Sequence, residues 1–166
     1  KVEVTALKTT SVAVGKSITL KGKAACEGKT KPVSTVVEFE IIEGEEYATI
    51  DAKGKLTGIA KGNVVVRISA EAGTDDAYED VEIRVCNNLA TKVTLNKTKA
   101  AMALGYGELQ LEAALVVKEG ECDDTLKWTV DKPEIATVDE DGLVTVHSAG
   151  KVKVTALAGS GKSASC

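Results

Sequence analysis

The sequence predicts an all-β protein composed of two similar antiparallel β-sandwiches, and three observations lead to this prediction. Apolar and polar residues alternate with a period of two along most of the chain, and no apolar pattern has the 3.6-residue period of an amphipathic helix. Glycines suited to tight turns separate the alternating runs. Much of the first half is also repeated: ATIDAKGKLTG at 48–58 returns 88 residues later as ATVDEDGLVTV at 136–146.

The clearest alternating runs in the first half are expected to form strands. They cover residues 17–24, 36–41, 63–70 and 80–85. In the second of these runs Val37, Phe39 and Ile41 point to one side, and Glu38 and Glu40 point to the other. Such alternation is typical of an antiparallel sheet with one face on a core and the other face in water. About six or seven short strands in each half, without a helix, predict a two-sheet sandwich.

A repeated turn and a repeated aromatic position indicate that each half is a complete domain. Gly54 and Gly142 occupy equivalent turns, where glycine supplies the positive φ that a tight hairpin needs. The only phenylalanine, Phe39, and the only tryptophan, Trp128, fall at the same position of the repeat. Both side chains are therefore predicted to be central in the two structural cores.

Length and composition agree with two small domains and argue against several classes of protein. The 166 residues are 43% hydrophobic and only 3% aromatic, so each core must be mainly aliphatic. We expect a first domain at 1–86 and a second at 87–166, each able to bury a modest core. A net charge of −4 and the lack of a Lys/Arg-rich run argue against nucleic acid as a partner. No apolar run is long enough to cross a membrane, so no membrane insertion is expected in this chain.

The second half carries the most specific motif, LKWTVDKPEIATVDEDGLVTVHSAGKVKVTA at 126–156. This stretch resembles the bacterial immunoglobulin-like domain of group 2, through Trp128, Pro133, the segment 136–139, Gly142 and Gly150. The first half is a more divergent copy in which Phe39 replaces the tryptophan. The resemblance covers nearly the whole chain and implies two tandem immunoglobulin-like sandwiches.

The resemblance also implies a function. Members of this family occur in tandem on bacterial and phage surface proteins, including intimin- and invasin-like adhesins, and on secreted glycan-degrading enzymes. A cell-surface or extracellular location and a non-catalytic role as a spacer or cell-adhesion repeat are therefore expected. The expected partners are other repeats of the same parent protein, with a host surface protein or polysaccharide as a further option. The alternative function is a module that binds a glycan or a host protein, with or without calcium.

Few residues are candidates for chemistry. His147, the only histidine, is expected to be a solvated residue at a strand end, because a hydrolase triad needs a base beside its nucleophile. Asp139 and Asp141 are the candidates for a Ca²⁺ site, since Ca²⁺ prefers oxygen ligands. Aspartates in turns more often cap the backbone, and Asp139 repeats Asp51 of the first half. We expect no catalytic residue, no cofactor and no metal other than this calcium option.

The four cysteines do not form C-x-x-C pairs. Cys122 lies in a loop of the second domain and Cys166 at the start of its last expected strand, so a disulfide between them is predicted. Cys26 and Cys86 are expected to be small buried thiols. The repeat also predicts that the last strand of the second domain is cut short at Cys166, which leaves a sheet edge able to recruit another strand unless the parent protein continues. Because residue 1 is lysine rather than methionine, we expect the chain to be a piece of a longer protein.

Overall fold

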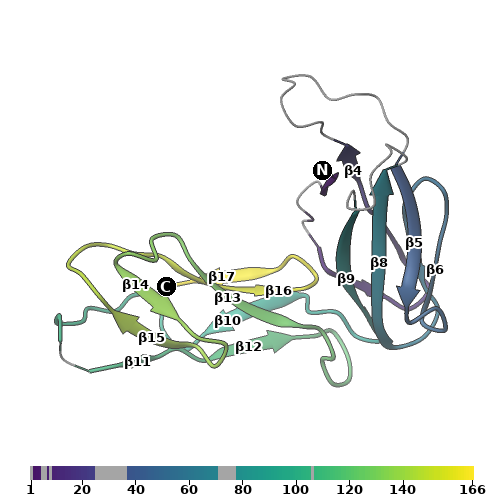
Figure 1. Cartoon of the computed structure of the whole chain (residues 1–166). Coiled ribbons are helices and arrows are strands. Elements are labelled where there is room, and N and C mark those ends of the chain that lie inside the picture. Colours follow the sequence, from purple (N-terminus) through teal and green to yellow (C-terminus); the bar gives the residue numbers. More distant parts are fainter. Residues whose placement is uncertain (1, 5–6, 8, 25–36, 71–77, 106) are drawn as a thin grey trace. The chain divides into compact units, whose positions relative to one another are not determined.

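The computed structural model describes residues 2–4, 7, 9–24, 37–70, 78–105 and 107–166. The chain divides into two compact units, Lys1–Asn87 and Asn88–Cys166 (Figure 1). The described residues form strands, bridges and turns but no helix, so none of them belongs to a helix that could span a membrane. Each unit closes sheets around its own apolar core, which confirms the predicted all-β fold class with two sandwiches.

Nine strands form the described part of the first unit. They are β1 (Val2–Val4), β2 (Ser11–Ala13), β3 (Ser17–Thr19), β4 (Gly22–Ala24), β5 (Val37–Glu43), β6 (Ala48–Ile50), β7 (Lys55–Gly58), β8 (Gly62–Ala70) and β9 (Tyr78–Cys86). One sheet has the order β2-β9-β8-β5, and a second has the order β3-β7-β6. β1 and β4 form a separate antiparallel pair.

The last strand of the first unit, β9, is hydrogen-bonded to a neighbouring strand on each side. β8 pairs with β9 in an antiparallel register along most of the length of both strands. The end of β9 also pairs in parallel with β2, so that Ser11 lies opposite Arg84 and Ala13 opposite Cys86. β9 therefore links β2 to the rest of its sheet.

The first core is aliphatic, as the low aromatic content requires. Its buried side chains come from both sheets and include Val12, Leu20, Ile41, Leu56, Val64, Val66, Ile68, Ile83 and Val85. Burial of each such side chain contributes roughly 1.5–3 kcal/mol. Phe39 is half-buried and packs against this cluster from β5.

Eight strands form the described part of the second unit. They are β10 (Lys92–Leu95), β11 (Leu109–Gln110), β12 (Ala113–Val116), β13 (Leu126–Val130), β14 (Ala136–Val138), β15 (Leu143–Val146), β16 (Val154–Ala158) and β17 (Ser163–Ser165). The sheets have the orders β13-β16-β17 and β11-β15-β14, and β10 pairs with β12. The plan of the first unit therefore recurs, except that no described strand of the second unit corresponds to β2.

The last strand of the second unit is short, but it begins earlier than the sequence indicated. β17 starts at Ser163 rather than at Cys166, because a tight turn reverses the chain directly after β16. In this turn the Gly161 N–H donates to the Ala158 carbonyl over 2.8 Å. β17 has three residues where β9 has nine, and Cys166 extends the pairing through two 2.9 Å backbone hydrogen bonds to Val154.

The second core is built around Trp128, which is only 9% exposed. The other buried members of this cluster are Ala90, Val93, Leu111, Ala136, Val144, Val154, Ala156 and Ala158. Trp128 lies opposite Ala156, whereas the smaller ring of Phe39 lies opposite Ile68. A larger ring facing a smaller partner keeps the packed volume similar in the two cores.

Candidate functional site

The phrase that is repeated in the sequence encodes a hairpin turn capped by an aspartate. Asp139 Oδ1 accepts hydrogen bonds from the backbone N–H groups of Asp141 (3.0 Å) and Leu143 (2.8 Å). Asp51 does the same in the turn between β6 and β7, over 2.8 and 3.0 Å. Because a turn leaves backbone N–H groups without a strand partner, the carboxylate supplies the missing acceptor.

The glycine of the same turn lies against the repeated aromatic ring. Gly142 has a φ of +84°, and a Cβ added to it would lie 2.8 Å from Trp128 Cζ2. Gly54 has a φ of +76°, and a Cβ there would lie 2.8 Å from Phe39 Cζ. Each aromatic ring packs directly on the glycine of its turn, and any side chain at the glycine position would collide with the ring. The turn glycine and the aromatic residue therefore recur together.

Replacing Asp139 by alanine is expected to destabilise the second unit by about 1 kcal/mol, because two turn N–H groups lose their acceptor. Asp141→Ala, in the same turn, is the matched control and is expected to change stability by less than about 0.5 kcal/mol. Urea denaturation followed by the fluorescence of Trp128 measures both effects. Equal losses for the two variants would contradict the capping role of Asp139.

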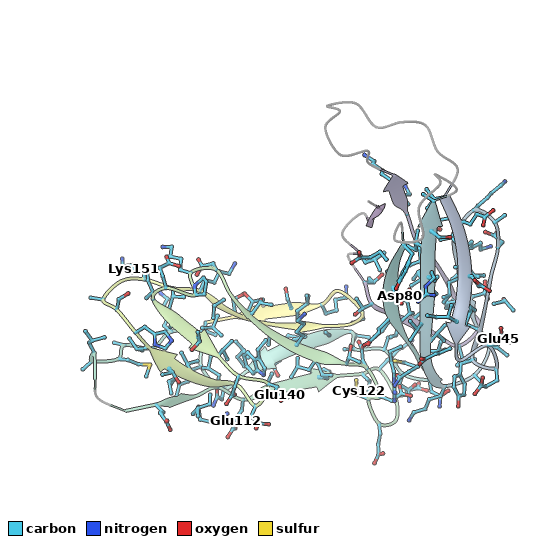
Figure 2. The ribbon with its side chains drawn as sticks, in the orientation of Figure 1. Glu45, Asp80, Glu112, Cys122, Glu140 and Lys151 are labelled. Carbon is cyan, nitrogen blue, oxygen red and sulfur yellow. The ribbon has the colours of Figure 1, made fainter. Side chains whose placement is uncertain are left out.

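The first unit is expected to lose stability in acid. The backbone N–H groups of Lys55 and Lys53 hold the pKa of the Asp51 carboxyl below its ordinary value of 3.8. The hydrogen-bonded Arg67 guanidinium likewise lowers the pKa of Asp80 (Figure 2). Because both folded-state pKa values lie below the unfolded ones, the stabilisation is present above about pH 4 and is lost as the pH falls through the folded values.

Thermal unfolding of the first unit, followed by backbone amide NMR from pH 6 down to pH 2, measures this loss. Asp51→Asn keeps an acceptor oxygen in the turn but does not titrate, so its melting temperature should fall less steeply with acid. An unchanged slope in this variant would show that Asp51 does not contribute.

Among the described residues, the candidate calcium ligands Asp139 and Asp141 do not belong to a group of three or more side chains that could hold a metal ion. Asp139 Oδ1 already accepts two backbone hydrogen bonds within its turn. In the described part of the chain, no three His, Cys, Asp or Glu side chains come together as metal ligands. Asp123 and Asp124 accept backbone N–H groups from the first residues of the second unit, over 2.8 and 3.1 Å. The acidic pair at 75–76 lies outside the described residues.

His147 is exposed and directly follows the last residue of β15. Its Nε2 lies 2.9 Å from Thr137 Oγ1, a residue of the neighbouring strand β14. The adjacent Ser148 hydroxyl donates to the carbonyl of Glu134 over 2.9 Å instead of contacting the imidazole. This arrangement is that of a solvated residue at the end of a strand.

The predicted disulfide between Cys122 and Cys166 is wrong in this structure, where both thiols are free. Cys122 lies in the loop before β13, near the end of β16 at Ala158 (Figure 2). Cys166 pairs with Val154 at the other end of β16. A strand of this length separates its ends by about 13 Å, whereas a disulfide needs Cα atoms within about 7 Å.

Of the two cysteines in the first unit, the structure describes Cys86. Cys86 is fully buried at the end of β9, with 0% of its surface exposed. Its thiol therefore packs as a small apolar group would. Cys26 lies outside the described residues.

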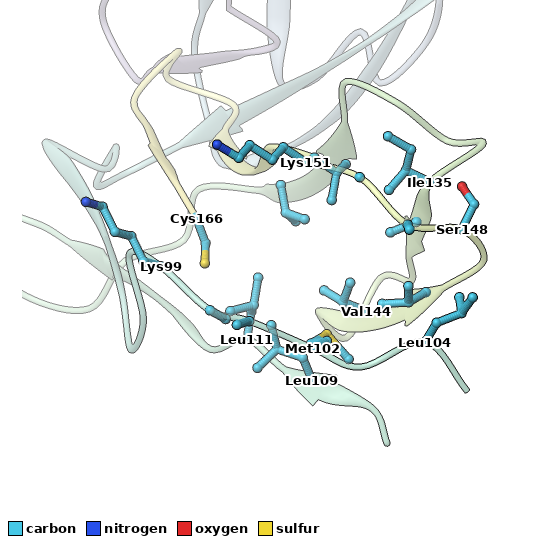
Figure 3. A pocket seen from close by; sticks show the side chains of 18 of the residues that line it. Lys99, Met102, Leu104, Leu109, Leu111, Ile135, Val144, Ser148, Lys151 and Cys166 are labelled. Carbon is cyan, nitrogen blue, oxygen red and sulfur yellow. The ribbon is translucent and has the colours of Figure 1, made fainter. Parts of the chain in front are cut away.

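An apolar groove of ≈ 680 Å³ opens on the second unit (Figure 3). One side is the segment 98–104, which includes Met102 and Leu104. The other side contains Val152 and the start of β16, and Cys166 lies beside it. Leu104 is 56% exposed, a large fraction for an apolar side chain. The groove is thus an accessible hollow with two backbone segments along its sides.

One family of known domains matches both units of the chain. The model of the bacterial Ig-like domain (group 2) matches residues 1–81 and 89–166. The chain belongs to this family. The resemblance based on the repeated motif is therefore confirmed, and the bacterial Ig-like chain contains two tandem copies of the domain.

One relative of the bacterial Ig-like chain is an uncharacterized protein of Clostridium acetobutylicum. The two are 27% identical over 121 residues, which is 72% of this chain. The chain spans only 12% of that relative's length.

Three solved structures are similar to the bacterial Ig-like chain over most of its length. A C-terminal fragment of intimin, in complex with the intimin-binding domain of its translocated receptor, has 23% identity and a TM-score of 0.39, covering 99% of this chain and 61% of the fragment. Domains 4 and 5 of the S-layer protein SbsC have 17% identity and a TM-score of 0.41, covering 99% and 94%. Fibronectin(III)-like modules of CbhA from Clostridium thermocellum have 19% identity and a TM-score of 0.38, covering 99% and 89%. These likenesses concern the fold alone.

The groove of the second bacterial Ig-like unit was not predicted from the sequence. The sequence indicates that the last strand is short, but it does not show that 98–102 and 148–152 line one hollow. A second signal was the change from Gly58 to Val146 at equivalent positions of β7 and β15. The sequence does not show that Gly58 lies against Val85, whose Cγ1 would be 2.7 Å from a Cβ added to Gly58.

Proposed function

We infer that this chain is a non-catalytic structural and adhesion module of a bacterial cell-surface or secreted protein, acting as a spacer or a cell-adhesion repeat. Its partners are other repeats of the same parent protein. The module uses no cofactor and no metal. Any contact with a host protein or a polysaccharide is made by exposed strand edges and loops.

The main support for this proposal is the structural role of the residues that recur in both units. Asp51, Gly54 and Phe39 serve one turn and core, and Asp139, Gly142 and Trp128 serve the other. The side chains that the two units share therefore maintain the fold. In the described residues, the histidine, the aspartates and the serine discussed above contact backbone or strand neighbours instead of converging on one place.

Two further facts support a modular role at the cell surface. Membership of the bacterial Ig-like family agrees with the tandem arrangement expected of surface and secreted proteins. The Clostridium relative contains the similar stretch as a small part of a much longer chain, which is compatible with a building unit of a longer protein.

Single-molecule pulling on the two-unit chain tests the spacer role. A spacer of two independent units should give two separate unfolding events, each releasing roughly 25 nm of chain. One shared event, or extension without a force peak, would contradict the proposal.

Binding measurements separate the spacer from a ligand-binding module. The chain is immobilised and exposed to glycan arrays and host matrix proteins, with calcium and with a chelator. A purely spacing role predicts no saturable binding in either condition, whereas a cell-adhesion repeat predicts saturable binding that persists with the chelator. Saturable binding that disappears on chelation would favour the calcium-dependent alternative.

A further inference from the structure

The segment 88–90 carries the chain from the first unit into the second, just before β10. The first unit ends at Asn87 and the second begins at Asn88, so tension passed along the chain from the first unit enters the second at Asn88. The backbone leads this tension to β10, which starts at Lys92 and pairs, among the described strands, with β12. What else holds 88–90 therefore decides how the second unit bears tension.

Two neighbouring carboxylates hold this segment. Asp123 Oδ1 accepts the backbone N–H of Asn88 over 2.8 Å, and Asp124 Oδ2 accepts the backbone N–H of Ala90 over 3.1 Å. Hydrogen bonds to an ionised carboxylate are roughly twice as strong as those between neutral groups. The side-chain amide of Asn88 also donates to the Glu121 carbonyl over 3.1 Å. These bonds tie the segment to the loop that leads into β13.

Asp124 also joins the segment to the turn between β16 and β17. Its Oδ2 accepts a second backbone N–H, that of Ser160, over 3.1 Å. The Ser160 hydroxyl donates to the Ala90 carbonyl over 2.9 Å, so these two residues are connected directly as well as through the carboxylate. Asp124 Oδ1 accepts the backbone N–H of Thr125 over 2.8 Å. One carboxylate thus binds three segments that are far apart in the chain.

The two places to which the segment is tied are fixed to each other. The Gly159 N–H donates to the Thr125 carbonyl over 3.0 Å, and the Ala158 N–H donates to the Lys162 carbonyl over 2.8 Å. The strands that leave these places, β13 and β16, pair along five residues. Tension that reaches Asp124 is therefore borne by the sheet β13-β16-β17 as well as by β10.

We propose that Asp124, together with Asp123 and Ser160, is a mechanical anchor that passes tension from 88–90 to the sheet β13-β16-β17. Without the anchor, tension acts on β10, whose ladder with β12 has only four residue pairs. With the anchor, hydrogen bonds to three segments share the force and must break before β10 is pulled. The proposal rests on the spacer role, because a spacer is the kind of module that transmits tension.

The anchor predicts a specific change in the rate of unfolding under force. Interactions that are broken in the transition state slow unfolding, so their removal accelerates it by the full stabilisation that they provide. Forced unfolding is governed by this rate. Asp124→Ala should therefore make the second unit unfold at least about tenfold faster at constant force. Ser160→Ala loses the hydroxyl but keeps the N–H, so its acceleration should be smaller.

Force-clamp measurements on the whole chain, held at both ends, test this prediction. A glycine–serine insertion of about ten residues after Gly107 identifies the second unit, because it lengthens only that unit's unfolding step, by roughly 3.5 nm. Gly107 suits the insertion because it is exposed and nothing lies within 4 Å of a Cβ placed on it. All variants carry this insertion.

Asp139→Ala is the matched control. It also removes a carboxylate that accepts two backbone N–H groups, but in the turn between β14 and β15. Both alanine variants should lower the stability of the second unit in urea, and only Asp124→Ala should accelerate its unfolding under force. Asp124→Asn keeps one acceptor oxygen and serves if the alanine variant does not fold. Its acceleration should be smaller than that of Asp124→Ala and larger than that of Asp139→Ala.

Two results would overturn the anchor. Equal acceleration by Asp124→Ala and Asp139→Ala would mean that only general stability matters. Unchanged rates in both Asp124 variants would mean that the carboxylate bears no force. The spacer role fails in a different way, since one shared unfolding step in the chain without substitutions contradicts it. Two separate steps whose rates do not depend on Asp124 contradict the anchor and leave the spacer role in place.

Discussion

Trp128→Ala is expected to destabilise the second unit by about 3–5 kcal/mol, the usual cost of removing a large aromatic side chain from a core. Trp128 is 9% exposed and belongs to a cluster whose other members are mostly alanine and valine. These small side chains cannot extend into the space that the indole leaves, so a cavity remains. A loss of this size consumes much of the 5–15 kcal/mol that a typical domain has.

Urea denaturation followed by far-UV circular dichroism measures the effect, because the variant lacks the fluorescent indole. Val116→Ala is the control, since Val116 is also in the second unit but is 42% exposed, and it should cost less than about 0.5 kcal/mol. The transition of the first unit should not move. If Trp128→Ala cost no more than the control, the ring would not be the centre of this core.

Gly142→Ala is expected to destabilise the second unit by about 2–5 kcal/mol. Alanine at a φ of +84° costs roughly 1–2 kcal/mol in backbone strain. Its Cβ would also collide with the Leu111 carbonyl and with the ring of Trp128, which adds an overpacking cost of about 1–3 kcal/mol. Denaturation followed by the fluorescence of Trp128 reports both the lost stability and the displaced ring.

Gly105→Ala separates the two costs. Gly105 has a similar φ of +77°, but nothing lies within 4 Å of the place where its Cβ would be. This control should therefore show only the strain of about 1–2 kcal/mol. Equal losses at Gly105 and Gly142 would mean that the contact with Trp128 contributes nothing to the requirement for glycine.

Some features of the fold were accessible from the sequence for a simple physical reason. Alternation in 36–41 and 63–70 marks strands because side chains along a strand point to opposite faces in turn. Asp139 and Gly142 mark a turn because a carboxylate and a positive φ act within a few residues. Phe39 and Trp128 could be paired as equivalent positions because the repeat has few insertions.

Other features could not be predicted from the sequence. The distance between Cys122 and Cys166 depends on which end of β16 each residue approaches, and that depends on the turn at Gly161. The contact of Gly142 with Trp128 joins the turn between β14 and β15 to a strand of a different sheet. The groove depends on segments 98–104 and 148–152, which are far apart in the chain.

The sequence by itself determined that this protein is all-β, that it is two copies of one bacterial Ig-like unit, and that tight turns lie at Gly54 and Gly142. These properties follow from interactions between residues close in the chain and from the repeat. The tertiary structure alone decided that the two cysteines stay apart and that the second unit carries an apolar groove flanked by Lys99 and Lys151. Both outcomes depend on how strands distant in sequence pair, and residue patterns within single strands do not specify that pairing.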